Sequence, residues 1–153
     1  MKRTFLLWFE IVALPFALAA GTNDFNARDF GAKGDGKTDD TAAFQKALDA
    51  AAYAGGGTVL APRGNYFFAG HLNVPGAVTL EGTWKSIPAH TGLRDPGFSK
   101  PTDDGTTFLV TENAGKEDAP PFITLNHNST LKGVVIFYPE QDAADEPKAY
   151  PWT

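Results

Sequence analysis

The sequence contains no cysteine, so a secreted form of the protein could not use disulfides for stability. It also has no concentration of basic residues, because the net charge is −5 and acids and bases are interspersed, which argues against a nucleic-acid partner. Beyond residue 20, no apolar run is long enough to span a bilayer. Stability must therefore come from packing and backbone pairing, and 153 residues suffice for one domain with a core.

Motifs for catalysis or metal binding are equally scarce. The three histidines are isolated from one another and lack the spacing of zinc ligands: His71, His90 and His127. The adjacent acid pairs are Asp39-Asp40, interpreted as a helix cap, and Asp103-Asp104, interpreted as a turn. No nucleophile elbow and no Ser/His/Asp order stands out. The sequence therefore assigns no catalytic residue, no metal ligand and no cofactor, and it leaves the substrate-binding residues unknown.

Residues 1–20 have the pattern of a signal peptide. Lys2 and Arg3 provide the positive start, Phe5–Leu18 the apolar core, and Ala17–Ala19 the small residues of a cleavage site. The alternative is a membrane anchor, but the apolar run is short for a span and includes Glu10. We predict a secreted or periplasmic protein with no membrane segment after cleavage, whose mature part is residues 21–153.

The stretch from Asp29 to Asp40, DFGAKGDGKTDD, has three glycines and four aspartates. It predicts a turn-rich lead-in segment rather than a strand or helix, with Asx turns at Asp35 and Asp39. Asp39 or Asp40 is expected to cap a helix that begins near Thr41. A Ca²⁺ loop is the alternative, but the EF-hand spacing is absent, as is the GxGxxG spacing of a dinucleotide site. Capping and turn formation are therefore favoured over a ligand.

A helical pattern follows over Thr41–Tyr53. Its apolar positions have helical spacing and share one face: Phe44, Ala47, Leu48 and Ala51. Gly55 is the expected C-cap. An alanine-rich face suits close approach to a flat surface, so we predict that this helix covers the open end of a stack of strands. The alternative, a partner-binding helix, has only a small apolar face to offer.

Short extended runs separated by turns occupy most of the remaining chain. The predicted strands are Thr58–Ala61, Tyr66–Phe68, His71–Val74, Ala77–Glu81, Thr106–Thr111, Phe122–Asn126 and Ser129–Tyr138. Val78–Gly82 and Thr130–Val134 are similar in form, which indicates coils of about 20 to 25 residues with turns of variable length. Asn126 and Asn128 are expected in turns that stack on neighbouring coils. We interpret the sequon Asn128–Thr130 as fortuitous.

Residues 83–105 show no period and predict a long loop. Trp84, His90 and Arg94 are residue types that stack on sugars or bond to them. The alternative is that Trp84 and Phe98 anchor the loop on the stack, and for each residue taken singly this structural role is favoured.

Several motifs, in their order, carry a resemblance to a known superfamily. They are FNARDFGAKGDGKTDD (residues 25–40), AAFQKAL (42–48), GGGTVLAPRGNY (55–66) and VTLEG (78–82). This order resembles the N-terminal region of the pectate-lyase-like superfamily, including its polygalacturonase, rhamnogalacturonase and epimerase branches. The resemblance implies an all-β fold, a right-handed single-stranded parallel β-helix, of which this chain would form the N-terminal cap helix and first coils. The catalytic motifs of polygalacturonases are not found here in order, and in that branch the catalytic aspartates sit on central coils.

The resemblance implies the N-terminal portion of a secreted polysaccharide-active protein, a glycoside hydrolase or a polysaccharide lyase acting on an acidic or cell-wall polysaccharide. Residues 139–153 are polar and proline-rich and suggest no second cap, so we expect a fragment that is inactive alone. Whether the chain is an enzyme stays open. The alternative function is a non-catalytic glycan-binding or structural β-helix, such as a spike. A small β-sandwich is the alternative fold, and it predicts antiparallel hairpins.

Overall fold

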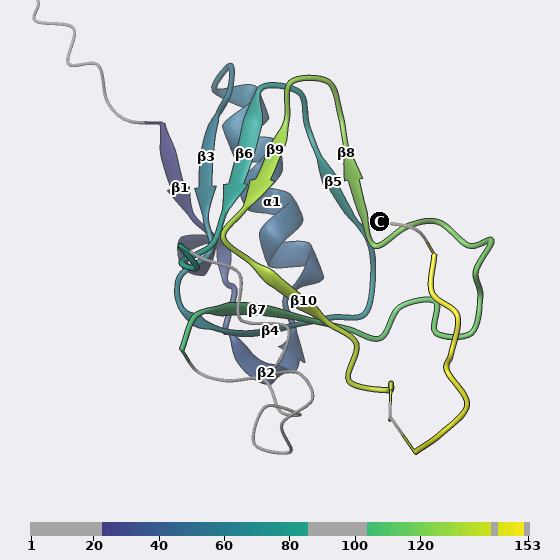
Figure 1. The fold of residues 1–153 in the computed structure, drawn as a ribbon. Helices are drawn as coiled ribbons and strands as arrows, with labels where there is room; N and C mark the ends of the chain where they lie inside the picture. The colour runs from purple at the N-terminus through teal and green to yellow at the C-terminus, as the bar shows by residue number, and fades with distance from the viewer. Residues whose placement is uncertain (1–22, 86–103, 142–143, 152–153) are drawn as a thin grey trace, which may run out of the picture.

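The computed structural model describes residues 23–85, 104–141 and 144–151, which form short strands around a single long helix (Figure 1). The predicted signal peptide, His90, Arg94 and Phe98 lie outside the described residues. The elements of the first half are β1 (Asp24–Asn26), the 3-10 helix η1 (Ala27–Phe30), β2 (Asp35–Asp39), α1 (Thr41–Tyr53), β3 (Gly57–Leu60), β4 (Gly64–Phe68) and β5 (Leu72–Val74). Those that follow are β6 (Val78–Glu81), β7 (Thr106–Val110), β8 (Ile123–Leu125), β9 (Thr130–Lys132) and β10 (Val135–Phe137).

Every strand pair among the described residues is parallel, and these strands form three sheets in the orders β1-β3-β6-β9, β10-β7-β4-β2 and β5-β8. The chain visits the sheets in rotation, so each turn adds one strand to a sheet next to the strand of the turn before. This is a parallel β-helix, as predicted. Parallel pairing rules out the sandwich alternative, because hairpin-connected strands would pair antiparallel.

The weak internal repeat of the sequence is a structural repeat. Leu80 lies opposite Leu131 and Glu81 opposite Lys132, so VTLEG and TLKG occupy equivalent places on successive coils. Thr58 pairs with Thr79, 21 positions later, which fits the predicted coil length. Thr79 pairs with Thr130, 51 positions later, and the longer interval includes β7, β8 and the segments that connect them.

Side chains that point into the coils form the core. Val59 and Leu80 are in register and fully buried, and Leu131 continues the row half-buried. Phe44 of α1 inserts among aromatic rings of the second and third coils, with ring centroids 4.9 to 5.4 Å away: Tyr66, Phe68 and Phe108. Such stacking of like residues on adjacent rungs buries a continuous core that no single coil could form.

The helix has the predicted bounds, and its four predicted core residues are fully buried. It contacts β1, β3 and β5, and in Figure 1 it crosses the centre of the ring that the three sheets outline. Its end differs from the prediction in one detail, because Ala54 is the C-cap and Gly55 follows it with a φ of 89°. The N–H groups of Gly55 and Gly56 donate to Ala52 and Ala51, so the glycine ends the helix by a Schellman motif.

The prediction that the lead-in segment contains no strand is wrong. Asp35–Asp39 forms β2 and pairs with β4, with Asp35 opposite Asn65, Asp39 opposite Phe67 and an irregularity between them. The local sequence favours turns, but β4 supplies backbone partners that only the coiled chain brings near. The predicted strand Ser129–Tyr138 is in fact two strands, because Gly133 has a φ of 67° and turns the chain between β9 and β10.

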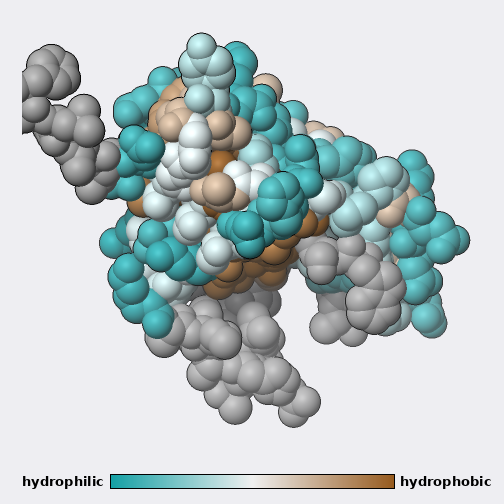
Figure 2. Space-filling model, turned by 90° about the horizontal axis from the view of Figure 1, so that it is seen from above, coloured by the Kyte–Doolittle hydropathy of each residue, from teal (hydrophilic) through white to brown (hydrophobic). Residues whose placement is uncertain are grey.

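The last coil leaves apolar groups accessible at the end of the stack opposite α1. Strands β9 and β10 are edge strands of their sheets, Leu131 and Ile136 are only half-buried, and the Leu125 side chain is 49% exposed. Figure 2 shows hydrophobic residues at the surface in the middle of the view, with hydrophilic residues above them. The described part of the chain contains no helix with the length and apolar composition needed to cross a membrane.

Candidate functional site

Asp35 and Asp39 make the local turns that the sequence predicts. The Asp35 carboxylate accepts hydrogen bonds from the backbone N–H groups of Lys37 and Thr38 and from the Thr38 hydroxyl. These bonds lower the pKa of Asp35 from 3.8 to about 2. Asp39 accepts from the N–H and hydroxyl of Thr41 and from the N–H of Ala69. Partial burial raises the pKa of Asp39, but the hydrogen bonds outweigh it and leave the pKa below its ordinary value.

Asp40 occupies the N-cap position of α1 but does not cap it with its side chain. Its carboxylate is almost fully buried and accepts from the N–H groups of Lys33 and Gly34. The Asp39 carboxylate instead accepts a hydrogen bond from the Thr41 N–H. Of the two predicted capping residues, Asp39 is therefore the one whose side chain caps the start of the helix. Within the described ranges, no group of three or more His, Asp or Glu side chains is placed to hold a metal ion.

Trp84 takes the anchoring role that the sequence favours for it. Its indole N–H donates to the Thr106 carbonyl at 3.1 Å, and its backbone N–H donates to the Gly133 carbonyl at 3.0 Å. The ring lies so close to Gly105 that a Cβ there would overlap it. Trp84 thus fastens the start of the 83–105 segment to the strands beside it.

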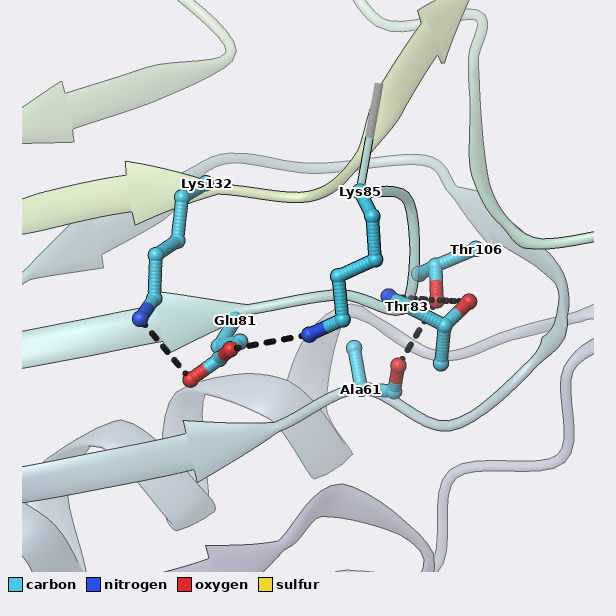
Figure 3. A network of polar contacts seen from close by, with 6 residues as sticks. All are labelled: Ala61, Glu81, Thr83, Lys85, Thr106 and Lys132. Carbon is cyan, nitrogen blue, oxygen red and sulfur yellow. Dashed lines mark hydrogen bonds and ion pairs between the residues drawn. The ribbon is translucent and has the colours of Figure 1, made fainter. Parts of the chain in front are cut away.

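A charged network lies on the outside of the stack, where the third and fourth coils meet (Figure 3). Glu81 of β6 is in ion-pair distance of Lys132 on β9, with 3.1 Å between Oε2 and Nζ. Lys85, four residues after Glu81, lies 3.8 Å from the other carboxylate oxygen. Both lysine side chains are more than half exposed, whereas that of Glu81 is 25% exposed. The cluster therefore presents two accessible cations and one partly covered anion.

Hydrogen bonds of the Thr106 hydroxyl hold the backbone beside this network in place. The Thr106 hydroxyl donates to the Ala61 carbonyl at 2.7 Å and accepts from the backbone N–H of Thr83 at 3.0 Å. Thr106 is fully buried, so its bond to the Ala61 carbonyl is shielded from water. They tie the end of β3, the segment after β6 and the start of β7 together (Figure 3), and they hold the backbone that carries Lys85.

This arrangement is suited to binding anionic groups through the two lysines, because accessible ammonium groups attract them over about a Debye length. Sequence reasoning missed Glu81, Lys85 and Lys132 as site residues. A signal was present: the similar motifs at 78–82 and 130–134 place Glu81 and Lys132 at the same position before a glycine. Aligning these repeats would have predicted that the two residues lie side by side on the surface.

Comparison with known proteins gives the family and its named relatives. Residues 25–135 match the family described as rhamnogalacturonase A/epimerase, pectate lyase-like. Mannuronan C5-epimerase AlgE2 of Azotobacter vinelandii is 62% identical over 95 residues, which are 61% of this chain and 10% of that protein. Alginate lyase 7 of the same organism is 64% identical over 47 residues, 31% of this chain and 6% of that protein.

Among solved structures, the A-module of mannuronan C-5 epimerase AlgE4 of Azotobacter vinelandii is similar, with a TM-score of 0.52 and 28% identity. The likeness covers 74% of this chain and 28% of that structure. The chain thus spans a tenth or less of the two curated relatives named above and about a quarter of this solved module.

Proposed function

Because this chain belongs to the rhamnogalacturonase A/epimerase, pectate lyase-like family, we propose that it is the N-terminal part of a secreted protein that modifies an acidic polysaccharide. The observation that carries the proposal is the 62% identity with mannuronan C5-epimerase AlgE2 over 95 residues. The relatives' names refer to mannuronan and alginate, which favours a uronate polymer as the substrate class. The reaction would be hydrolysis, elimination or epimerisation, carried out by residues on further coils.

Two observations support the view that further coils complete the domain. The curated relatives are at least ten times longer than the stretch they share with this chain. The end of the stack opposite α1 also carries half-buried apolar residues, and β9 and β10 are edge strands among the described residues; such an end normally requires a cover. Leu125, Leu131 and Ile136 are the residues that an additional coil would bury.

The charged network of Glu81, Lys85 and Lys132 supports an acidic rather than a neutral polymer. Its two exposed lysines would attract the carboxylates of a polyuronate, and the attraction should weaken as salt is raised. The network is proposed as a binding surface and not as catalytic machinery, since both of its lysines pair with the one carboxylate.

The proposed function can be tested with the 153-residue protein itself. Affinity electrophoresis in gels that contain polymannuronate should retard the protein at low ionic strength, whereas a neutral glucan should not. A sensitive assay of uronate cleavage and epimerisation should show no turnover by this chain. Equal migration in both gels would refute the uronate assignment, and robust turnover would refute the inactivity of the isolated segment.

Secretion is part of the proposal and has its own test. The positive start, apolar core and small-residue site of residues 1–20 support export with cleavage near Ala20. Expression in a bacterium with an intact secretory pathway should give an extracytoplasmic protein whose N-terminus, determined by mass spectrometry, is Ala20 or Gly21. Retention of Met1 on an exported, membrane-bound product would instead identify an anchor.

A non-catalytic glycan-binding or structural β-helix is the second candidate. The cluster of exposed lysines is compatible with adhesion to an anionic glycan without any chemistry. The sequence that continues this domain distinguishes the two candidates, because an enzyme would place converging carboxylates on consecutive coils and a scaffold would not.

A further inference from the structure

A second polar feature lies where the first coil meets the second. It is a recess of about 440 Å³ that opens to solvent and is lined by Arg28, Gly34, Asp35, Arg63, Gly64 and Asn65. Residues before and within β2 form one side, and the start of β4 forms the other. The lining combines two guanidinium groups with a carboxylate and an amide, so the recess is polar and of mixed charge.

Arg28 is held in place at this recess by contacts with its surroundings. Its Nη2 donates to the Arg63 carbonyl at 3.0 Å, and its guanidinium carbon lies 5.9 Å from the centre of the Tyr66 ring. Tyr66 is itself fixed, because its ring is buried and its hydroxyl donates to the Pro62 carbonyl. A guanidinium has five N–H donors, so Arg28 has donors beyond the one that binds the Arg63 carbonyl. No ion pair joins Arg28 to a carboxylate anywhere in residues 23–85, 104–141 and 144–151.

Two glycines keep the space beside Arg28 open. A Cβ on Gly34 would lie 2.9 Å from the Tyr66 ring and 3.3 Å from Arg28 Nη2. A Cβ on Gly64 would lie 3.2 Å from Arg28 Nη2 and 3.0 Å from the Gly34 carbonyl oxygen. Both glycines also have positive φ, at 65° and 157°, which disfavours any side chain there. Backbone geometry thus leaves the guanidinium reachable from the recess.

Asp35 adds an acceptor to the recess. Its carboxylate is ionised at neutral pH and lines the same recess, so it offers an anionic hydrogen-bond acceptor beside the guanidinium groups. Oδ1 is occupied by two backbone N–H groups, whereas Oδ2 receives one hydroxyl and can accept a further hydrogen bond. A ligand that suits the recess therefore carries both a carboxylate, for Arg28, and hydroxyl groups, for Asp35.

We infer that the recess binds one uronic acid residue of an acidic saccharide, with Arg28 paired to its carboxylate and Asp35 accepting from a ring hydroxyl. The planar guanidinium can hold a carboxylate through two parallel N–H donors, which a lysine cannot do. The choice of an acidic saccharide rests on the proposed function, but the site is separate from the network of Glu81, Lys85 and Lys132. It would position a polymer near the helix-capped end of the β-helix.

The test is a titration of the ¹⁵N-labelled 153-residue protein with a mannuronate tetrasaccharide, and in parallel with a neutral mannose tetrasaccharide. The mannuronate oligomer should shift the amide signals of Gly34, Gly64 and Asn65, and the neutral one should not. R28Q should weaken binding at these signals by about tenfold or more, and R28K by less, because the lysine keeps the charge and loses the paired donors. K132Q, at the other site, is the matched control and should leave these shifts unchanged.

Three results would overturn the inference. If the amide signals of Gly34 and Gly64 did not shift while those around Lys132 did, the ligand would bind at the other site. The proposed function would then stand and this inference would fail. Equal affinity of R28Q and the unaltered protein would show that Arg28 is not the recognition group. Equal shifts with the neutral mannose tetrasaccharide would show that the protein does not recognise the carboxylate of the saccharide. If R28Q fails to fold, the amide shifts of the unaltered protein with the two oligomers decide the inference by themselves. Electrophoresis in polymannuronate tests the proposed function separately.

Discussion

Asp40 and Lys33 are joined by a 2.7 Å hydrogen bond in which the Lys33 backbone N–H donates to Asp40 Oδ1. The second carboxylate oxygen accepts from the Gly34 N–H at 3.0 Å. The residue at the start of α1 therefore fixes the turn that precedes β2, and it couples the cap helix to the first coil. Asp40 is only 1% exposed, so its carboxylate depends on these two N–H groups for hydrogen bonds.

Asp40→Ala should destabilise the protein by about 1–3 kcal/mol, because two partly buried N–H groups lose their buried acceptor. Asp40→Asn keeps one acceptor oxygen and should cost less than the alanine variant. The matched control is Asp49→Ala on the exposed face of the same helix, expected within about 0.5 kcal/mol of the unaltered protein. Urea unfolding followed by circular dichroism measures all three, and equal losses for the Asp40 and Asp49 variants would contradict this role.

Acid should destabilise the fold through Asp35. Its pKa is about 2 in the folded protein and 3.8 ordinarily, so its contribution is present above pH 4 and is lost as the pH falls towards 2. Asp40 acts in the opposite direction, because burial raises its pKa and protonation then favours the folded state. Urea midpoints at pH 5, 3 and 2 should fall less steeply in Asp35→Asn than in the unaltered protein. If the urea midpoints of Asp35→Asn and the unaltered protein fell equally with pH, Asp35 would not be the source of the acid sensitivity.

Phe108→Ala should cost about 3–5 kcal/mol, because the ring is fully buried and packs edge-on against Phe44 and Phe68. Phe108→Leu retains most of the volume and should cost much less. Thermal and urea unfolding measure the two variants. Near-equal stability would show that the aromatic cluster is not the centre of the core.

Gly82→Ala tests the close approach of the third and fourth coils. A Cβ at Gly82 would overlap the Gly133 carbonyl, which is backbone and cannot rotate away, so we expect a loss of about 1–3 kcal/mol or more. Gly70→Ala is the control, because its Cβ would meet the Thr41 side chain rather than backbone, with the methyl group nearest at 3.2 Å. The difference in unfolding free energy between the two variants is the quantity to measure, and a larger loss at Gly70 would contradict the prediction.

Glu81→Gln should strengthen binding to polymannuronate, because it frees Lys85 and Lys132 from their shared carboxylate. Lys132→Gln should weaken it, and both effects should shrink at high salt. The stability changes should stay within about 1 kcal/mol, as expected of ion pairs with exposed lysines. Affinity electrophoresis at two ionic strengths measures the binding. Weaker retention of Glu81→Gln would show that the carboxylate itself contacts the polymer.

Local sequence patterns were sufficient to predict the elements that depend only on neighbouring residues, such as the helix and the Asx turns. The spacing of Phe44, Ala47, Leu48 and Ala51 placed the buried face of α1, because helical periodicity depends only on neighbouring residues. The Asx turn at Asp35 followed from its own short-range hydrogen bonds. The order of motifs predicted the parallel coils, and the similarity of residues 78–82 and 130–134 indicated the repeat that β6 and β9 realise.

The tertiary structure decided whatever depends on partners far away in the chain. Only the pairing with β4 makes a strand of the glycine-rich Asp35–Asp39 segment. Only coiling brings Glu81 next to Lys132 and sets Arg28 over Tyr66 at the recess of the first two coils. The physical reason is that a β-helix obtains its backbone hydrogen bonds and its surface clusters from adjacent coils, whose register depends on loops of unequal length. The sequence by itself determined what each segment can form, and the stacking determined which side chains meet.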